Sequence, residues 1–151
     1  MDIHERIPLI FGVPEPSFYG RLKEKRVFVA ELRPALEGTK VVAKELLKRG
    51  IQPVIICDNM LAFCMKRGLV KDVSIFYTAL NKNTSLCRTG SLIAALCARI
   101  HKIPVLLYKT GWIVSKTPVS LLKIGGKKVT SQDLKNYVPL LEEVPLELAK
   151  G

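Results

Sequence analysis

The chain has 151 residues, of which 48% are hydrophobic, and this is enough for one domain with its own core. Its formal net charge of +11 favours anionic partners: phosphorylated metabolites, nucleotides, nucleic acid or an acidic protein surface. No apolar run is long enough to span a bilayer, and the N-terminus carries acids where a secretory signal needs basic residues. We therefore expect a soluble, cytoplasmic protein with no membrane partner.

Two regions are expected along the chain. Residues 1–25 are predicted to be an N-terminal extension, in which Ile7–Phe11 can form a short strand ahead of a turn-rich segment. Residues 26–151 are predicted to form a single α/β domain.

The domain is predicted to open with two strands joined by a helix. Arg26–Leu32 is β-branched and apolar, and Pro53–Cys57 is so apolar that we expect both of its faces to be covered. The helix between them ends at Gly50 and groups four apolar residues on one face: Val41, Val42, Leu46 and Leu47. Strands that are buried on both sides and separated by a helix are typical of a parallel crossover.

The remaining elements continue this alternation. We expect a helix from Asp58 or Asn59 to Arg67, a strand at Val73–Tyr77, a loop at Ala79–Ser91, a helix at Leu92–His101 and a strand at Ile103–Tyr108. Beyond Lys109 the pattern allows another strand within residues 109–122, a turn at 124–128, a short helix at Ser131–Tyr137, and a docked but irregular end from Val138. The elements together predict a doubly wound, mostly parallel α/β sheet.

The basic residues are spread along the chain rather than gathered. The tight clusters are Arg21–Arg26 and Lys127–Lys128, and neither alternates with the aromatic residues that single-strand binders need. We interpret the charge as solvated surface and do not expect a nucleic-acid partner.

The cysteines show neither C-x-x-C spacing nor a histidine at metal distance; they are Cys57, Cys64, Cys87 and Cys97. We therefore expect buried thiols, with no disulfide, no metal site and no cofactor.

Three loop segments follow successive predicted strands and should converge at the carboxyl edge of the sheet. The residues expected to line a shared anion pocket there are Arg33, Asp58, Asn59, Arg88, Thr89, Gly90 and Ser91. Free backbone N–H groups at the start of the Leu92–His101 helix would bind a phosphate, and Arg33 and Arg88 can each fork onto one. The same residues can also be interpreted without a binding site, with Arg33 as a surface arginine, Asp58 as a helix N-cap and Thr89–Ser91 as an ordinary helix start.

Acid–base chemistry needs a titratable group in that pocket. Glu31 and Asp58 are the best placed carboxylates, although either could simply hold an arginine or a backbone amide. Cys87 has Arg88 and a helix start beside it, which would lower its pKa, but no base is visible next to it. His4 and His101 are interpreted as bystanders.

These segments also carry a resemblance to a known family. The stretches "VAELRPALEGTKVVAKELLKRGI", "ICDNMLAFCM", "CRTGSLIAALCARIHKIPV" and "VPLLEEVPLELA" occur in the order of the family's "E-[ST]-R-P…G…A..L...GI", "I-[TS]-D-[NS]-[AM]", "N-K-[IV]-G-T…A..A...-IP" and "NP.[FY][DE]..P.EL" segments. This family joins the alpha, beta and delta subunits of translation initiation factor 2B with methylthioribose-1-phosphate isomerase and ribose-1,5-bisphosphate isomerase. The resemblance covers about residues 26 to 148. It implies a three-layer, Rossmann-like fold of the kind shared with ribose-5-phosphate isomerase and CoA transferases.

The departures from the family pattern concern its catalysts. The family's isomerases carry a catalytic aspartate in a "GADR" segment after the third strand, where this chain has "FYTAL" and no carboxylate from Val73 to Ser91. Their catalytic cysteine lies just upstream of the first matched strand, and this chain has no cysteine before Cys57. We also expect no counterpart of the helical N-terminal domain that completes their substrate site.

We therefore expect a non-catalytic domain, related to the initiation factor 2B subunits, that binds a phosphorylated metabolite or a nucleotide monophosphate, protein partners, or both. The first alternative is a sugar-phosphate isomerase that uses other residues, such as Glu31, Asp58 and Cys87. A third possibility is nucleic-acid binding driven by the charge alone. A homodimer is also expected, because the family pairs through this domain and many apolar residues follow Lys109.

Overall fold

The computed structural model describes residues 3–114 and 119–149. Its centre is a seven-stranded sheet with the strand order β3-β2-β1-β4-β5-β9, and β6 also pairs with β4. The strands are β1 (Ile7–Phe11), β2 (Arg26–Ala30), β3 (Gln52–Ile56), β4 (Val70–Leu80), β5 (Thr84–Arg88), β6 (Val105–Lys109) and β9 (Leu141–Pro145). A separate two-stranded hairpin pairs β7 (Lys123–Ile124) with β8 (Lys127–Lys128).

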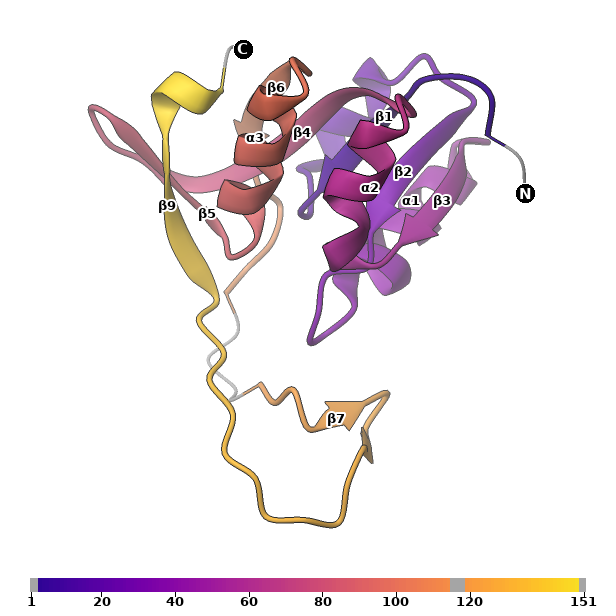
Figure 1. The fold of residues 1–151 in the computed structure, drawn as a ribbon. Helices are drawn as coiled ribbons and strands as arrows, with labels where there is room; N and C mark the ends of the chain where they lie inside the picture. The colour runs from indigo at the N-terminus through magenta and orange to yellow at the C-terminus, as the bar shows by residue number, and fades with distance from the viewer. Residues whose placement is uncertain (1–2, 115–118, 150–151) are drawn as a thin grey trace.

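Helices cover both faces of this sheet (Figure 1). The helices are α1 (Ala43–Lys48), which continues the π-helical turn η2 (Gly38–Val42), α2 (Leu61–Lys66) and α3 (Ser91–Ile100). The described residues also form three 3-10 helices: Pro16–Arg21, Asp58–Met60 and Leu146–Leu148. In Figure 1, α2 and α3 lie in front of the sheet and α1 lies behind it. The mixed sheet with helices confirms the α/β class.

The sheet is parallel at its centre and antiparallel at one side. Strands β1, β2, β3, β4 and β6 run parallel, whereas β5 pairs antiparallel with β4 and β9 pairs antiparallel with β5. The carboxyl ends of the parallel strands therefore meet at one edge, as the sequence predicts.

Strand β1 lies between β2 and β4, and all five of its residues are buried. Its apolar run is packed on both faces, so burial rather than alternation shapes its composition. The strand that the sequence predicts at Ile7–Phe11 is therefore present, and it is part of the sheet core rather than outside it.

The second predicted crossover strand differs from expectation in its burial. Strand β3 is at the edge of the sheet, and Ile55 on it is 41% exposed. The expectation that both faces of this strand are covered is therefore wrong.

The segment Ala79–Ser91 is not a loop. It holds the end of β4 and all of β5, joined by a tight turn in which the amide of Asn81 donates to the carbonyl oxygen of Thr84 at 2.8 Å. Of the polar residues in this segment, Asn81, Lys82 and Asn83 lie in the exposed turn, whereas Ser85 and Arg88 are buried in β5.

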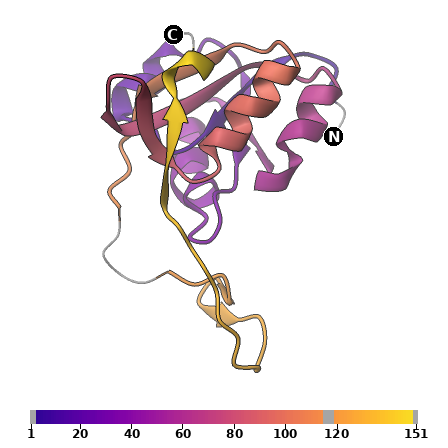
Figure 2. The ribbon, with the colours of Figure 1, turned by 60° about the vertical axis from the view of Figure 1, so that its left-hand side comes forward.

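Residues 119–140 form an arm that stands away from the sheet (Figures 1 and 2). The predicted turn is present as the β7–β8 hairpin, in which Gly125 and Gly126 adopt φ of 58° and 81°. The helix predicted at Ser131–Tyr137 is absent. Of the strand predicted within residues 109–122, only Lys109 lies in a strand, and 115–118 are outside the described residues. The end of the chain docks as predicted but is regular, because it forms β9 beside β5.

Among the residues that the structure describes, no helix has the length and apolarity needed to cross a membrane.

Candidate functional site

The loop that follows β2 is held in place by Asp58, at the end of β3. The Asp58 carboxylate accepts hydrogen bonds from the backbone amides of Leu32 (2.9 Å) and Arg33 (2.7 Å). Leu32 has a φ of +62°, a conformation that bulky residues rarely adopt, and these bonds help to fix it. Asp58 makes no capping bond to its own helical turn, so it joins two loops instead.

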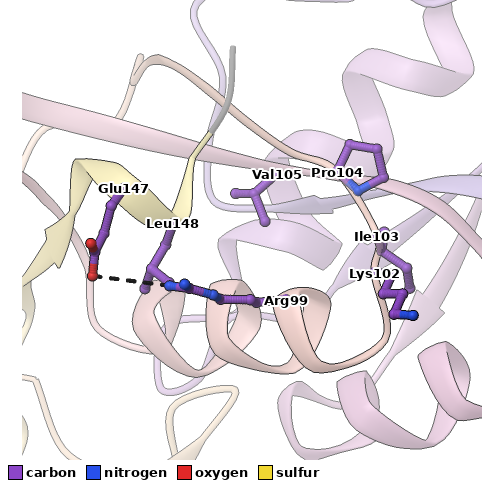
Figure 3. A pocket seen from close by; sticks show the side chains of 7 residues that line it. All are labelled: Arg99, Lys102, Ile103, Pro104, Val105, Glu147 and Leu148. Carbon is purple, nitrogen blue, oxygen red and sulfur yellow. Dashed lines mark ion pairs between the residues drawn. The ribbon is translucent and has the colours of Figure 1, made fainter.

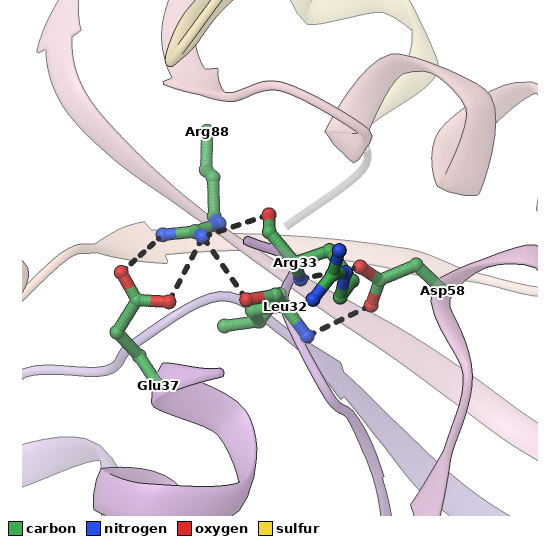
Figure 4. A network of polar contacts seen from close by, with 5 residues as sticks. All are labelled: Leu32, Arg33, Glu37, Asp58 and Arg88. Carbon is green, nitrogen blue, oxygen red and sulfur yellow. Dashed lines mark hydrogen bonds and ion pairs between the residues drawn. The ribbon is translucent and has the colours of Figure 1, made fainter. Parts of the chain in front are cut away.

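Arg88, the last residue of β5, is buried beneath this loop, with a relative exposure of 6%. Its Nη1 and Nη2 atoms donate to the two carboxylate oxygens of Glu37 at 3.0 and 2.9 Å (Figure 4). Nη2 also lies 3.3 Å from the carbonyl oxygens of Leu32 and of Arg33. The guanidinium carbon is 4.7 Å from the centre of the Trp112 ring. Most of the binding capacity of Arg88 is thus used inside the protein.

The start of α3 is occupied by Glu142 of β9. Its Oε1 atom accepts hydrogen bonds from the backbone amides of Gly90 (2.7 Å) and Leu92 (2.9 Å). The expectation that these amides are free for a phosphate is wrong, because a carboxylate of the chain already complements the positive end of the helix. Gly90 has a φ of +105° and sits so close to the Phe11 ring that an added Cβ would lie 2.4 Å from it.

A pocket of about 170 Å³ lies between this network and the arm. It is lined by Arg33, Pro34, Arg88, Thr89, Leu121, Tyr137, Val138, Pro139 and Leu140. Within the described part of the chain, Arg33 Nη1 and Thr89 Oγ1 are buried and have no hydrogen-bond partner. The other terminal nitrogen, Arg33 Nη2, donates to the carbonyl oxygen of Leu121 at 3.2 Å.

The structure thus brings together part of the predicted set. Arg33, Arg88 and Thr89 line the pocket, and Asp58 holds the backbone of Arg33 by a hydrogen bond from its amide. Asn59 is exposed and lines no part of this pocket, and Gly90 and Ser91 belong to the start of α3. The sequence reasoning missed Glu37 and Glu142, the two acids that complete the network.

The two other chemical candidates differ in environment. Glu31 is half-buried, and within the described residues no hydrogen bond to its carboxylate is present, whereas its amide donates to the carbonyl oxygen of Ile56 at 2.9 Å. Cys87 is fully buried, and burial raises the pKa of its thiol; the Glu142 carboxylate raises it further, against a hydrogen bond with Ser85 that lowers it. The prediction of a lowered pKa at Cys87 is therefore wrong.

A different pocket lies at the opposite edge of the sheet, where α3 ends and β6 begins (Figure 3). It has a volume of about 360 Å³ and an apolar floor that includes Ile103, Val105 and Leu148. The ion pair at its rim joins Arg99 and Glu147 at 4.0 Å, and both side chains are largely exposed. It brings no buried polar group together, so the carboxyl edge remains the candidate site.

A model of the Initiation factor 2 subunit family matches residues 18–110, more than half of the chain. The chain belongs to this family. It is 31% identical over 147 residues to methylthioribose-1-phosphate isomerase of Thermosynechococcus vestitus, covering 87% of this chain and 41% of that protein. It is 29% identical over 143 residues to the protein of the same name from Nostoc sp., covering 85% of this chain and 41% of that protein. The chain thus spans about two fifths of these family members.

Solved structures of the family share the fold. The chain superposes on 5-methylthioribose 1-phosphate isomerase from Pyrococcus horikoshii with a TM-score of 0.76 and 20% identity, over 97% of this chain and 49% of that one. For the delta subunit of translation initiation factor eIF-2B from A. fulgidus the TM-score is 0.75 at 20% identity, over 96% of this chain and 51% of that one.

The comparisons correct one prediction. The chain was expected to be a non-catalytic binding domain, but family members at about 30% identity over most of its length are named as isomerases. They favour the alternative, a sugar-phosphate isomerase.

Proposed function

We propose that this chain takes part in isomerising a phosphorylated ribose, of the kind that methylthioribose-1-phosphate isomerase acts on, with catalytic groups placed differently from those of the family's isomerases. The observation that carries the proposal is the similarity of 29–31% to proteins of that name across 85–87% of this chain. The carboxyl-edge pocket is the proposed site, because two of the three buried side-chain groups without a partner in the described residues line it, the third being the Ser91 hydroxyl at the start of α3.

The phosphate of the substrate would bind to Arg33 Nη1 and Thr89 Oγ1. Both groups are buried without a partner in the described residues, and a buried unsatisfied donor costs about 1–3 kcal/mol. An oxyanion would satisfy both, and its bond to the guanidinium would be charge-assisted.

Moving a proton between neighbouring carbons of a sugar requires a general base that takes the proton from one carbon and, once protonated, returns it as the acid to the next. Asp58 already accepts two backbone amides, so we assign it to positioning the Arg33 loop. Glu31, two residues before Arg33, is outside the lining of the pocket, but within the described residues its carboxylate is not engaged in this way, and we assign it as the base. Cys87 is left out, because its buried thiol holds its proton.

The test is a direct assay of ketose formation from methylthioribose-1-phosphate, followed by NMR. Glu31→Gln should lower kcat by about 10²–10⁴-fold, the usual contribution of a general base. Glu5→Gln is the matched control, since Glu5 is an exposed acid that pairs with Arg26. No turnover by the unaltered protein would overturn the isomerase assignment, and full activity in Glu31→Gln would overturn the assignment of the base.

The finer features of the fold and partners are also proposals. We infer a doubly wound, three-layer, Rossmann-like fold. Two observations support it: β2 and β3 lie on one side of β1 whereas β4 and β6 lie on the other, and helices cover both faces of the sheet. A nucleotide monophosphate as ligand, a homodimer, further protein partners and a cytoplasmic location all stay predictions.

A further inference from the structure

We propose that the pocket accepts one anionic group only, so that its ligand is a sugar monophosphate rather than a bisphosphate, and that Glu37 is the residue that sets this limit. The inference rests on the proposed function, since it concerns the same pocket, but its test measures binding and not turnover.

Three positions at this edge could attract a phosphate: the start of α3, Arg88 and Arg33. The first is filled by the chain itself. Glu142 Oε1 accepts the amides of Gly90 and Leu92 at 2.7 and 2.9 Å, so the positive end of α3 already holds a negative charge.

The second position is filled as well. Glu37 binds Arg88 with two parallel hydrogen bonds of 3.0 and 2.9 Å, and the side chains are only 17% and 7% exposed. The backbone carbonyl oxygens of Leu32 and Arg33 and the ring of Trp112 take up most of the rest of the guanidinium. A phosphate that approached Arg88 would meet the Glu37 carboxylate in a poorly hydrated place, where like charges repel strongly.

Within the described residues, only the third position offers a charged donor without a partner, since the unpartnered group at the start of α3 is the neutral, fully buried Ser91 hydroxyl. Arg33 Nη1 lacks a partner within the described residues, its backbone is fixed by Asp58, and the unpartnered Thr89 hydroxyl lines the same pocket. The pocket thus offers one guanidinium and one hydroxyl to an oxyanion, beside an ion pair with no net charge.

A rival position for a second phosphate lies on the other side of Pro34. Lys40 and Lys123 line a separate pocket of about 210 Å³ there, and both lysines are exposed. Because exposed lysines are well hydrated, we expect them to add little affinity for a bound sugar phosphate.

The experiment is titration calorimetry with ribose 5-phosphate and ribose 1,5-bisphosphate at fixed ionic strength. The unaltered protein should bind the monophosphate at least as tightly as the bisphosphate. Glu37→Gln frees Arg88, so the bisphosphate should bind about 10-fold tighter or more, a change that corresponds to one added charge-assisted hydrogen bond. The monophosphate should change by less than about 3-fold.

Two further variants separate this effect from others. Glu147→Gln removes the same charge from an exposed pair near the opposite edge and should leave both affinities unchanged. The double variant Glu37→Met with Arg88→Met removes the pair without leaving a lone charge, so it should fold and keep the preference for the monophosphate.

Several results would overturn the proposal. Tighter binding of the bisphosphate by the unaltered protein would do so, and loss of that binding in Lys40→Ala with Lys123→Ala would locate the second phosphate. Weaker binding of both ligands by Glu37→Gln would show that Glu37 maintains the structure of the pocket and does not set the limit of one anionic group. Unchanged binding of the monophosphate by Arg33→Ala would show that this pocket is not the binding site. Binding as expected without isomerisation would end the proposed function while supporting this inference.

Discussion

At the carboxyl edge of the sheet, three acidic side chains accept hydrogen bonds from groups that would otherwise be open to a ligand. Asp58 holds the Arg33 loop, Glu37 holds Arg88, and Glu142 caps α3. Each carboxylate comes from a different segment, so the edge is fixed by bonds that join distant parts of the chain. The cost of burying these charges is offset because each one is paired or hydrogen-bonded.

The thiols provide a residue-scale prediction. Cys57 is exposed just after β3, so the expectation of a buried thiol is wrong for this residue. Cys87 is fully buried with a raised pKa, and only thiolates react rapidly. Iodoacetamide at neutral pH should therefore modify Cys57 in the native protein and Cys87 only after unfolding, as read by peptide mass spectrometry. Labelling of Cys87 at the native rate of Cys57 would contradict this, and Cys57→Ser is the control for assignment.

Asp72 of β4 gives a prediction on pH. Burial raises the pKa of its carboxyl group, Lys71 lowers it and Glu24 raises it. The folded state therefore holds this proton more tightly than the unfolded chain, and stability falls as pH rises through the window above the ordinary value of about 3.9. Asp72→Asn should raise the melting temperature at pH 7 by a few degrees at most, which corresponds to about 0.5 kcal/mol, and should leave it unchanged at pH 3.

For Glu24 we expect a change in melting temperature of the opposite sign. A hydrogen bond from Lys71 lowers the pKa of Glu24, so its contribution to stability is present at neutral pH and is lost on acidification. Glu24→Gln should lower the melting temperature at pH 7. Equal shifts of the same sign in both variants would show that burial does not govern Asp72.

At the scale of elements, the packing of η2 against β2 depends on one glycine. A Cβ on Gly38 would lie 1.8 Å from the carbonyl oxygen of Ala30, so the backbones could not keep their present distance. Gly38→Ala should destabilise the protein by about 3 kcal/mol, at the upper end of overpacking costs, in urea unfolding. The control is Gly20→Ala, because nothing lies within 4 Å of the Cβ there. Similar midpoints for the two variants would contradict this account.

The sequence predicts the elements whose burial is uniform and misses those that depend on distant partners. The strands around Val27–Ala30 and Val105–Leu107 and the helix α3 were found from apolar runs and helical periodicity. Strand β5 was missed because its neighbours Asn81–Asn83 are polar, and its pairing with β9 cannot be seen locally. The same holds for the candidate site. Arg33, Asp58 and Arg88 were predicted because they lie at or just after the ends of strands. Glu37 and Glu142 were not, because no local sequence motif marks a residue that will pair with a distant arginine or cap a distant helix.

At the scale of the whole molecule, apolar side chains remain exposed on at least three surfaces of the described residues, one of them on α3, where Ile93, Leu96 and Ile100 are 58%, 43% and 76% exposed. On the segment after β6 they include Ile113 and Tyr137, which are 87% and 85% exposed. Between β3 and α2, Phe63 is 61% and Ile55 is 41% exposed, beside a pocket of about 560 Å³. Apolar patches of this kind often mark interfaces, which supports the prediction of a homodimer.

Sedimentation equilibrium at micromolar concentration tests that prediction. The net charge of +11 opposes association, so the dimer should tighten in high salt. A single species of 16.8 kDa in both low and high salt would contradict the dimer. Phe63→Ser and Ile113→Ser then tell which surface associates, because only the variant at the interface should dissociate.

The position of β9 has a consequence for the order of folding. During synthesis, β9 emerges after every other strand of the sheet, yet it supplies the partner of β5 and, through Glu142, the cap of α3. Until β9 docks, β5 keeps an open edge and the first amides of α3 lack their acceptor. We therefore expect the parallel half of the sheet to form while the nascent chain still lacks a competent anion pocket, and β5 to need shielding from aggregation during that interval.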